Sequence, residues 1–131
     1  MSPSSPPQPG RPVRGSESGR PIMAAFDLLG RRWVLQIVGE LGAADLGFNE
    51  LQRRIGRISS SVLATRLREL SELSLVEVGD DGTYLLTELG RSLLLSLHGL
   101  FEWSDHWAAS RGQVVNEPLD PALVNRLQPE A

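Results

Sequence analysis

The chain has 131 residues, of which 40% are hydrophobic, 22% are charged and 5% are aromatic, and its formal net charge is −3 at pH 7. This length and balance indicate one soluble globular domain with tails. The sequence contains no cysteine, which excludes disulfides, cysteine–zinc sites and thiol redox chemistry. No apolar run approaches the roughly 18 residues of a membrane span, so we expect a cytoplasmic protein with no membrane partner.

Proline usage divides the chain into a central domain and two tails. Six of the nine prolines lie within the first 21 residues, and the other three lie after residue 117. The first segment is rich in Pro, Ser, Gly and Arg, and it can bury too little apolar surface to offset its ordering entropy. We therefore expect a disordered tail over 1–21, a folded domain over 22–111 and a second loose tail over 112–131.

A helical period of apolar residues runs through the first half of this domain. It predicts helices over residues 22–29, 33–41, 48–55 and 60–73. The second of these helices is apolar nearly all round and should be deeply buried. Gly30 is a suitable C-cap for the first helix, and Ser59 is a good N-cap for the fourth.

The spacing of apolar residues changes in the second half of the domain. Residues 75–78 and 83–86 are short and β-like, and the Gly-Asp-Asp-Gly turn between them predicts a β-hairpin. Thr87 can cap one long final helix from residue 88 to about residue 109. The predicted fold class is mainly α with a small β-hairpin, in the order α-α-α-α-β-β-α. This is the layout of a winged helix-turn-helix, in which the second helix of the motif lies in the DNA major groove.

The fourth predicted helix has two opposed faces on a helical wheel. Leu63, Leu67 and Leu70 cluster in one narrow sector, which must face the core. The opposite sector carries small and hydroxyl side chains followed by an arginine, and such side chains can contact base edges or phosphates. An ordinary solvated helix face is the alternative interpretation. The candidates for reading DNA are Ser59, Ser60, Ser61, Ala64, Thr65 and Arg68.

Charge favours nucleic-acid binding over the solvated face. Residues 49–68 contain five arginines and one acid, a net charge of +4, whereas residues 69–105 contain eight acids and one arginine, a net charge of −7. A basic block on the predicted reading unit is typical of proteins that bind nucleic acid. Arg66 lies at the core edge of the wheel and could pair with Glu69 instead. The candidates for phosphate contacts are Asn49, Arg53, Arg54, Arg57 and Arg66.

The last predicted helix carries two further patterns. Trp103 and Trp107 are four residues apart and share a face, which favours dimer packing or, alternatively, an aromatic effector pocket at a dimer interface. His98, Glu102 and His106 have a spacing that can hold a metal ion, but one helix face often shows it by chance. We predict no metal and no cofactor. The chain has no phosphate loop, nucleophile elbow or zinc-protease motif, so we predict that it is not an enzyme.

Several segments in order across the domain carry a family resemblance. They are residues 26–33, 48–55, 58–59, 63–70, 75–77 and 84–91, with Glu102 and Trp103 late in the last helix. Together they resemble the HxlR-type winged helix-turn-helix transcriptional regulators of bacteria. The resemblance implies a homodimer, joined through the first and last helices, that binds an inverted-repeat operator in double-stranded DNA. We expect a sequence-specific regulator that acts as a repressor, is cytoplasmic and nucleoid-associated, and responds to a small aromatic effector.

Two features depart from the resembled family. Many members carry a sensory cysteine just before a proline at the start of the first helix, but here Arg20 precedes Pro21, so that thiol cannot operate. The wing of the family is usually longer and basic, whereas Asp80 and Asp81 here would repel phosphate. The acidic wing favours the alternative function, a winged-helix protein-interaction module that no longer binds DNA.

Overall fold

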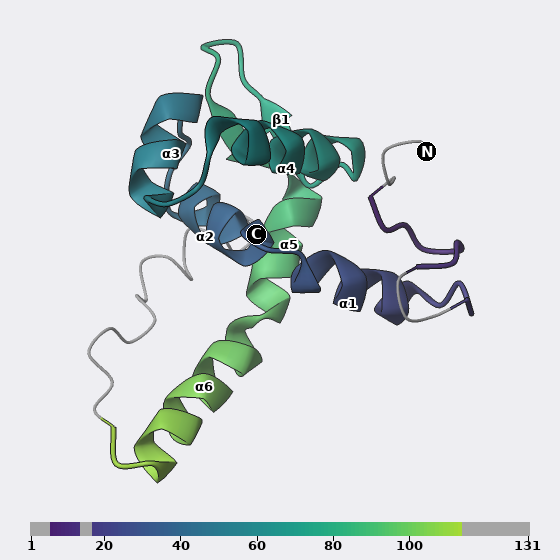
Figure 1. Cartoon of the computed structure of the whole chain (residues 1–131), viewed down its shortest axis with the longest axis vertical. Coiled ribbons are helices and arrows are strands. Elements are labelled where there is room, and N and C mark those ends of the chain that lie inside the picture. The colour runs from purple at the N-terminus through teal and green to yellow at the C-terminus, as the bar shows by residue number, and fades with distance from the viewer. Residues whose placement is uncertain (1–5, 14–16, 114–131) are drawn as a thin grey trace, which may run out of the picture.

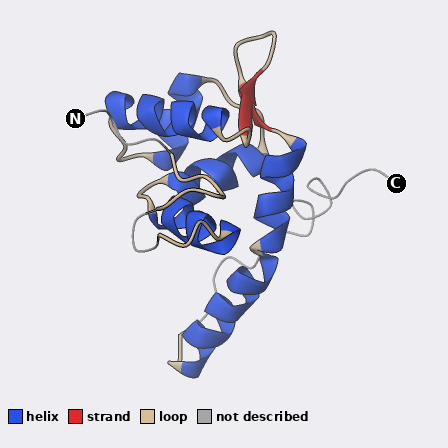
Figure 2. Ribbon diagram, turned by 90° about the vertical axis from the view of Figure 1, so that its right-hand side faces the viewer, coloured by secondary structure: helices blue, strands red, loops and turns tan. Residues whose placement is uncertain are grey.

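The computed structural model of the chain describes residues 6–13 and 17–113. Within these ranges the elements are α1 (Pro21–Gly30), α2 (Val34–Ala43), α3 (Phe48–Ile55), α4 (Ser60–Glu72), β1 (Val76–Val78), β2 (Tyr84–Leu86), α5 (Glu88–Ser96) and α6 (His98–Ser110). Helices α1 to α5 pack together, and α6 projects away from them on the side opposite to the hairpin turn (Figure 1; Figure 2). This arrangement confirms the predicted winged helix-turn-helix. No helix in the described ranges is long and apolar enough to cross a membrane.

Helix α2 lies at the centre of the domain, where it contacts α1, α3, α5 and β2. Its Val34, Ile37, Val38 and Leu41 side chains are buried, as the apolar pattern predicts, whereas Leu35 is exposed. Side chains from the surrounding elements pack around these residues as one contiguous core. Its other buried members are Leu28, Leu46, Leu51, Ile58, Leu63, Leu67, Leu70, Leu75, Val76, Leu86 and Leu94.

The boundaries near the α1–α2 junction differ from the sequence prediction. Helix α1 begins at Pro21, and Gly30 lies inside it, so Arg31 rather than Gly30 is the C-cap. Trp33 is not the first residue of α2 but its N-cap, with a left-handed φ of 78°. The guanidinium of Arg32 lies 4.6 Å from the centre of the Trp33 ring. A bulky residue rarely adopts a positive φ, so the apolar period could not show this turn.

The predicted single long final helix is wrong, because the chain breaks it at Leu97 into α5 and α6. In a continuous helix the Leu97 N–H would donate to the oxygen of Leu93. Instead Ser96 Oγ donates to that oxygen at 2.6 Å, and the Leu97 N–H donates to Leu94 at 3.2 Å. Gly99 follows within one turn. Serine back-bonding and glycine both weaken a helix, and the break directs α6 away from the domain.

Part of the predicted disordered tail lies against the domain. Pro6 and Pro7 are buried, and the N–H of Gly10 donates to the oxygen of Gly19 at 2.8 Å. Proline has little backbone freedom to lose on ordering, which explains how a proline-rich segment can pack on an apolar surface. The structure does not describe residues 1–5, 14–16 and 114–131. Nearly all of the predicted C-terminal tail therefore lies outside the described residues.

A buried ionic cluster fixes α4 against the junction between α1 and α2. Arg31 Nη1 donates to Glu69 Oε2 at 2.5 Å, and the two side chains are only 10% and 8% exposed. Arg66 Nη1 donates to the other carboxylate oxygen of Glu69 at 2.7 Å, while Arg66 Nε donates to the backbone oxygen of Arg32 at 3.0 Å. Asp27 on α1 lies 3.7 Å from Arg31. Because a buried charge without its partner is costly, this cluster sets the position of α4.

The hairpin is attached to the connection between α2 and α3. Its strands pair in antiparallel register, with Val76 opposite Leu86 and Val78 opposite Tyr84. Leu46 exchanges two backbone hydrogen bonds with Tyr84, at 3.1 and 2.7 Å. The hairpin therefore has a fixed place beside the helix-turn-helix.

Helix α5 begins in close contact with the backbone between α4 and β1. Thr87 caps it as predicted, because the Gly90 N–H donates to Thr87 Oγ1 at 3.0 Å. The same hydroxyl donates to the oxygen of Ser74 at 2.6 Å. A Cβ atom at Gly90 would lie 2.2 Å from the backbone oxygen of Leu75. The Thr87 N–H donates to the same oxygen at 3.0 Å and so keeps it in place. Only glycine fits this position without a shift of the backbone.

We expect Gly90→Ala to destabilise the protein by about 3 kcal/mol, at the upper end of common overpacking effects. Gly99→Ala is the matched control, because a Cβ atom at Gly99 in α6 would meet nothing within 4 Å outside its own stretch of helix. Alanine there should stabilise the helix by about 0.5–1 kcal/mol. Urea unfolding followed by circular dichroism measures both changes. Equal free energies of unfolding for the two variants would contradict the close contact at Gly90.

Candidate nucleic-acid interface

A tight turn joins α3 and α4 into the helix-turn-helix. Gly56 ends α3 with a φ of 96°, a conformation that favours glycine. Gln52 on α3 donates from Nε2 to the oxygen of Ile58 at 3.2 Å and to Ser60 Oγ at 3.1 Å. The Gln52 side chain therefore holds the first turn of α4 at a fixed place relative to α3.

The first turn of α4 has the predicted serine cap. The Val62 N–H donates to Ser59 Oγ at 3.2 Å, which confirms Ser59 as the N-cap. Ser61 Oγ lies 3.4 Å from Ser59 Oγ. All three serines from 59 to 61 are exposed. The hydroxyls therefore lie at the solvent-facing N-terminus of α4, where the free helix amides favour a phosphate oxygen.

The two faces of α4 are those that the helical wheel predicts. Leu63, Leu67 and Leu70 are buried in the core. On the opposite face Ala64 is exposed and Thr65 is half-buried. The structure thus places all the predicted reading residues on one continuous surface, from the serine cap to the middle of the helix: Ser59, Ser60, Ser61, Ala64, Thr65 and Arg68.

Arg68 is the long cationic side chain on this surface. Its side chain is 63% exposed, and its Nε lies 4.0 Å from Glu72 Oε1. An exposed ion pair at this distance contributes little free energy. The guanidinium can therefore leave Glu72 for a base or a phosphate at small cost.

Helix α3 and the turn that follows it present the other predicted phosphate-binding side chains. Asn49, Arg53, Arg54 and Arg57 are exposed. Arg53 and Arg54 both donate to the carboxylate of Glu50. These hydrogen bonds lower the pKa of Glu50 below its usual value, and the bond from Arg53 has the largest effect. Such solvent-exposed pairs are weak, so the two arginines can exchange Glu50 for a phosphate.

Arg66 differs from the other arginines of the basic block. Its side chain is 23% exposed and donates to Glu69 at 2.7 Å. This is the alternative pairing that the helical wheel indicated. Its second contact, to the oxygen of Arg32, directs it toward the α1–α2 junction. Arg66 therefore joins α4 to the α1–α2 junction and is not available to a phosphate.

The wing is short and negatively charged. The Gly79 N–H donates to the oxygen of Thr83 at 2.8 Å, and the Gly82 N–H donates to the oxygen of Gly79 at 3.0 Å. Asp81 Oδ1 accepts the Thr83 hydroxyl at 2.6 Å and the Thr83 N–H at 3.1 Å. Both hydrogen bonds lower the pKa of Asp81, and the bond from the Thr83 hydroxyl has the larger effect. Asp80 is also exposed, so two carboxylates lie at the tip of the wing.

The tryptophans of α6 lie on an exposed face. The rings of Trp103 and Trp107 stack with their centres 5.3 Å apart, and both residues are 56% exposed. On the same helix His98 Nε2 lies 2.9 Å from Glu102 Oε1. In the described ranges no three His, Cys, Asp or Glu side chains are placed to hold a metal ion.

Two residues that position this interface were not among the predicted site residues. Gln52 is simply a polar residue on a surface helix, and no local pattern shows that it bonds to the next helix. Arg31 has its partner Glu69 38 positions away along the chain, so only the folded structure brings the two together. The i,i+3 spacing of Arg66 and Glu69 and the i,i+4 spacing of Asp27 and Arg31 are local signals for this cluster, but neither links α4 to α1.

The chain matches the HxlR-like helix-turn-helix family over residues 28–111. An uncharacterized HTH-type transcriptional regulator of Mycobacterium tuberculosis is 32% identical over 120 residues, which cover 81% of this chain and 75% of the relative. The HTH-type transcriptional regulator YodB of Bacillus subtilis is 32% identical over 100 residues, which cover 72% of this chain and 89% of YodB.

Solved structures show the same likeness. The quinone-bound YodB from B. subtilis has a TM-score of 0.62 at 35% identity and covers 65% of this chain and 96% of that chain. A possible HxlR family transcriptional factor from Thermoplasma volcanium has a TM-score of 0.57 at 30% identity, with 65% and 82% covered. These relatives form a family of transcriptional regulators and not of enzymes. The chain therefore belongs to the HxlR-like helix-turn-helix family of DNA-binding transcriptional regulators.

Proposed function

We propose that the chain binds an inverted-repeat operator as a homodimer and represses transcription, with one α4 in the major groove of each half-site. The exposed face of α4 carries this proposal. Its small and hydroxyl side chains let the backbone approach base edges, and Arg68 has the length and geometry to read guanine. The residues assigned to the reading surface are Ser59, Ser60, Ser61, Ala64, Thr65 and Arg68.

Phosphate contacts come from α3 and the turn that follows it. Asn49, Arg53, Arg54 and Arg57 are exposed beside α4, and their charge supplies affinity and register without sequence preference. The acidic wing adds little affinity, because its carboxylates repel the backbone of DNA. Binding therefore depends on the helix-turn-helix more than on the wing.

A second copy of the chain covers the apolar faces of the first and last helices. No residue of α6 is buried in the single chain, and such a large apolar surface is typical of an interaction site. A two-fold dimer also matches the two-fold symmetry of an inverted repeat. The exposed apolar residues assigned to this interface are Ile22, Phe26, Leu100, Phe101, Trp103 and Trp107.

A small aromatic effector is part of the proposal. The solved structure of the relative YodB contains a quinone, and the stacked Trp103 and Trp107 offer aromatic faces at the proposed dimer interface. We place the regulator in the cytoplasm, associated with the nucleoid, where its operator lies.

A protein-interaction module is the second candidate function. The observation that favours it is the wing, where Asp80 and Asp81 are both exposed and would weaken DNA binding. In this case a partner protein would occupy the exposed face of α4.

Fluorescence anisotropy with the DNA upstream of the coding region tests the proposed function. Shuffled DNA of equal length is the control, and the titrations span low to physiological salt. We expect tight, sequence-dependent binding that falls steeply as salt rises, because arginine–phosphate contacts release counterions. Absence of binding at every salt concentration would contradict the proposal and favour the protein-interaction module.

Arg68→Ala tests the reading surface itself. If Arg68 contacts a base, its loss should cost about 1–3 kcal/mol of binding free energy on the operator and much less on shuffled DNA. Arg111→Ala is the matched control, because it removes the same charge from the exposed C-terminal end of α6. Equal small losses on both DNAs would mean that Arg68 contacts only phosphate.

Phe26→Glu tests the dimer. The substitution places a carboxylate in the apolar face of α1, so we expect sedimentation equilibrium to show a monomer where the unaltered chain is a dimer. Val78→Glu is the control, since Val78 is an equally exposed apolar residue on β1, away from both helices. A Phe26→Glu variant that stays dimeric would show that α1 does not form the interface.

A further inference from the structure

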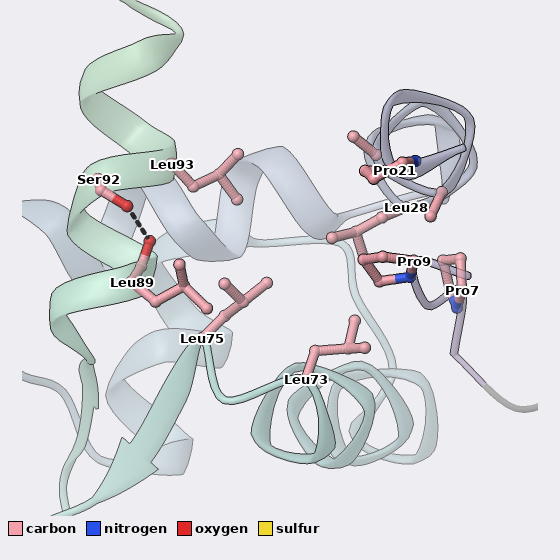
Figure 3. A pocket seen from close by; sticks show the side chains of 11 residues that line it. Pro7, Pro9, Pro21, Leu28, Leu73, Leu75, Leu89, Ser92 and Leu93 are labelled. Carbon is pink, nitrogen blue, oxygen red and sulfur yellow. Dashed lines mark hydrogen bonds between the residues drawn. The ribbon is translucent and has the colours of Figure 1, made fainter. Parts of the chain in front are cut away.

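A pocket of about 320 Å³ lies between α1, the end of α4, α5 and the N-terminal segment. Figure 3 shows Leu75, Leu89 and Leu93 on one side of it and Leu28 with Pro9 on the other. Trp103 and Trp107 do not line it. This pocket is therefore separate from the aromatic face of α6 and from the DNA-reading surface.

The lining of the pocket defines the chemistry that it accepts. Its side chains are those of leucine, alanine and proline, with Ser92 as the one polar residue among them. Ser92 Oγ donates its hydrogen to the oxygen of Leu89 at 2.7 Å, which leaves the hydroxyl oxygen able to accept one bond. No charged side chain lines the pocket, so a charged ligand would lose its hydration without gaining a partner.

The N-terminal segment forms one wall. Pro7 and Pro9 line the pocket, and Pro7 is buried. The bond from the Gly10 N–H to the oxygen of Gly19 at 2.8 Å holds this segment against the start of α1. The proline rings are rigid, so the wall keeps its shape at little cost in conformational entropy.

Size and lining together identify the class of ligand. A volume of about 320 Å³ lies at the small end of the range for small-molecule sites and is too small for a folded partner. Water gains few hydrogen bonds in so apolar a space, and its displacement by an apolar group is favourable. Because the chain has no cysteine, thiol addition cannot hold the ligand there.

We propose that this pocket reversibly binds an uncharged, mostly apolar small molecule with one hydrogen-bond donor, with Ser92 Oγ accepting that hydrogen bond and the proline segment as a wall. A bound molecule would contact α4 at Leu73 and α1 at Leu28. The site goes beyond the proposed function, and its existence does not depend on DNA binding.

The uncharged fluorescent probe N-phenyl-1-naphthylamine tests the site in a titration of the full chain. Leu89→Glu is the pocket variant, because the residue is 55% exposed and tolerates a carboxylate, which would lie at the pocket lining. Val78→Glu is the matched control, also 55% exposed but outside the pocket. Thermal unfolding of both variants checks that the fold is kept. We expect saturable binding to the unaltered chain, at least tenfold weaker binding to Leu89→Glu and a change of less than twofold for Val78→Glu.

Two results would overturn the proposal. One is no saturable binding to the unaltered chain. The other is unchanged affinity in Leu89→Glu, which would mean that the probe binds the exposed aromatic side chains of α6 instead. Removal of residues 1–9 tests the proline wall separately, with an expected loss of at least fivefold in probe affinity. Equal or tighter binding by the shortened chain would show that Pro7 and Pro9 do not form a wall of the site.

Discussion

The buried ion pair between Arg31 and Glu69 is the constraint on which the presentation of the DNA-reading surface depends. It joins the end of α1 to the last turn of α4 at 2.5 Å, and both side chains are almost fully removed from solvent. A buried ion pair is weak evidence for high stability, but it is demanding in geometry, since each charge must keep its partner. Glu69 accepts from Arg31, and Arg66 donates to the backbone oxygen of Arg32, so α4 can neither turn about its axis nor slide without breaking a charged hydrogen bond to the α1–α2 junction.

In this fixed position, one face of α4 is buried and the other is exposed. Its leucines join the core around α2, while its serines and Arg68 remain on the surface. Between residues 49 and 105 the chain also separates its charges, with five arginines and one acid in residues 49–68 and eight acids and one arginine in residues 69–105. A protein with a net charge of −3 can thus carry a basic surface where DNA would bind. After the break at Leu97, α6 projects from the domain, and none of its residues is buried in the single chain.

Local patterns predicted the parts of the fold that depend on local physics. The period of the leucines in α4, the Ser59 cap and the turn before Thr83 each depend on residues within a few positions, and the structure confirms them. Contacts between distant residues left no such pattern, and this is why Arg31 and Gln52 were missed. The break at Leu97 depends on competition among hydrogen bonds, and the left-handed φ of Trp33 is the conformation of a single residue. An apolar period records neither.

The affinity of Glu69→Gln for its operator and for shuffled DNA, measured at a temperature where the variant is folded, tests the role of the ion pair most directly. Glu72→Gln is the control, because it removes the same charge from an exposed position on the same helix. If the ion pair positions α4, Glu69→Gln should lose at least tenfold in operator affinity and little in affinity for shuffled DNA, since the arginines of α3 remain. Operator affinity equal to that of Glu72→Gln would show that the placement of the reading helix does not depend on this pair.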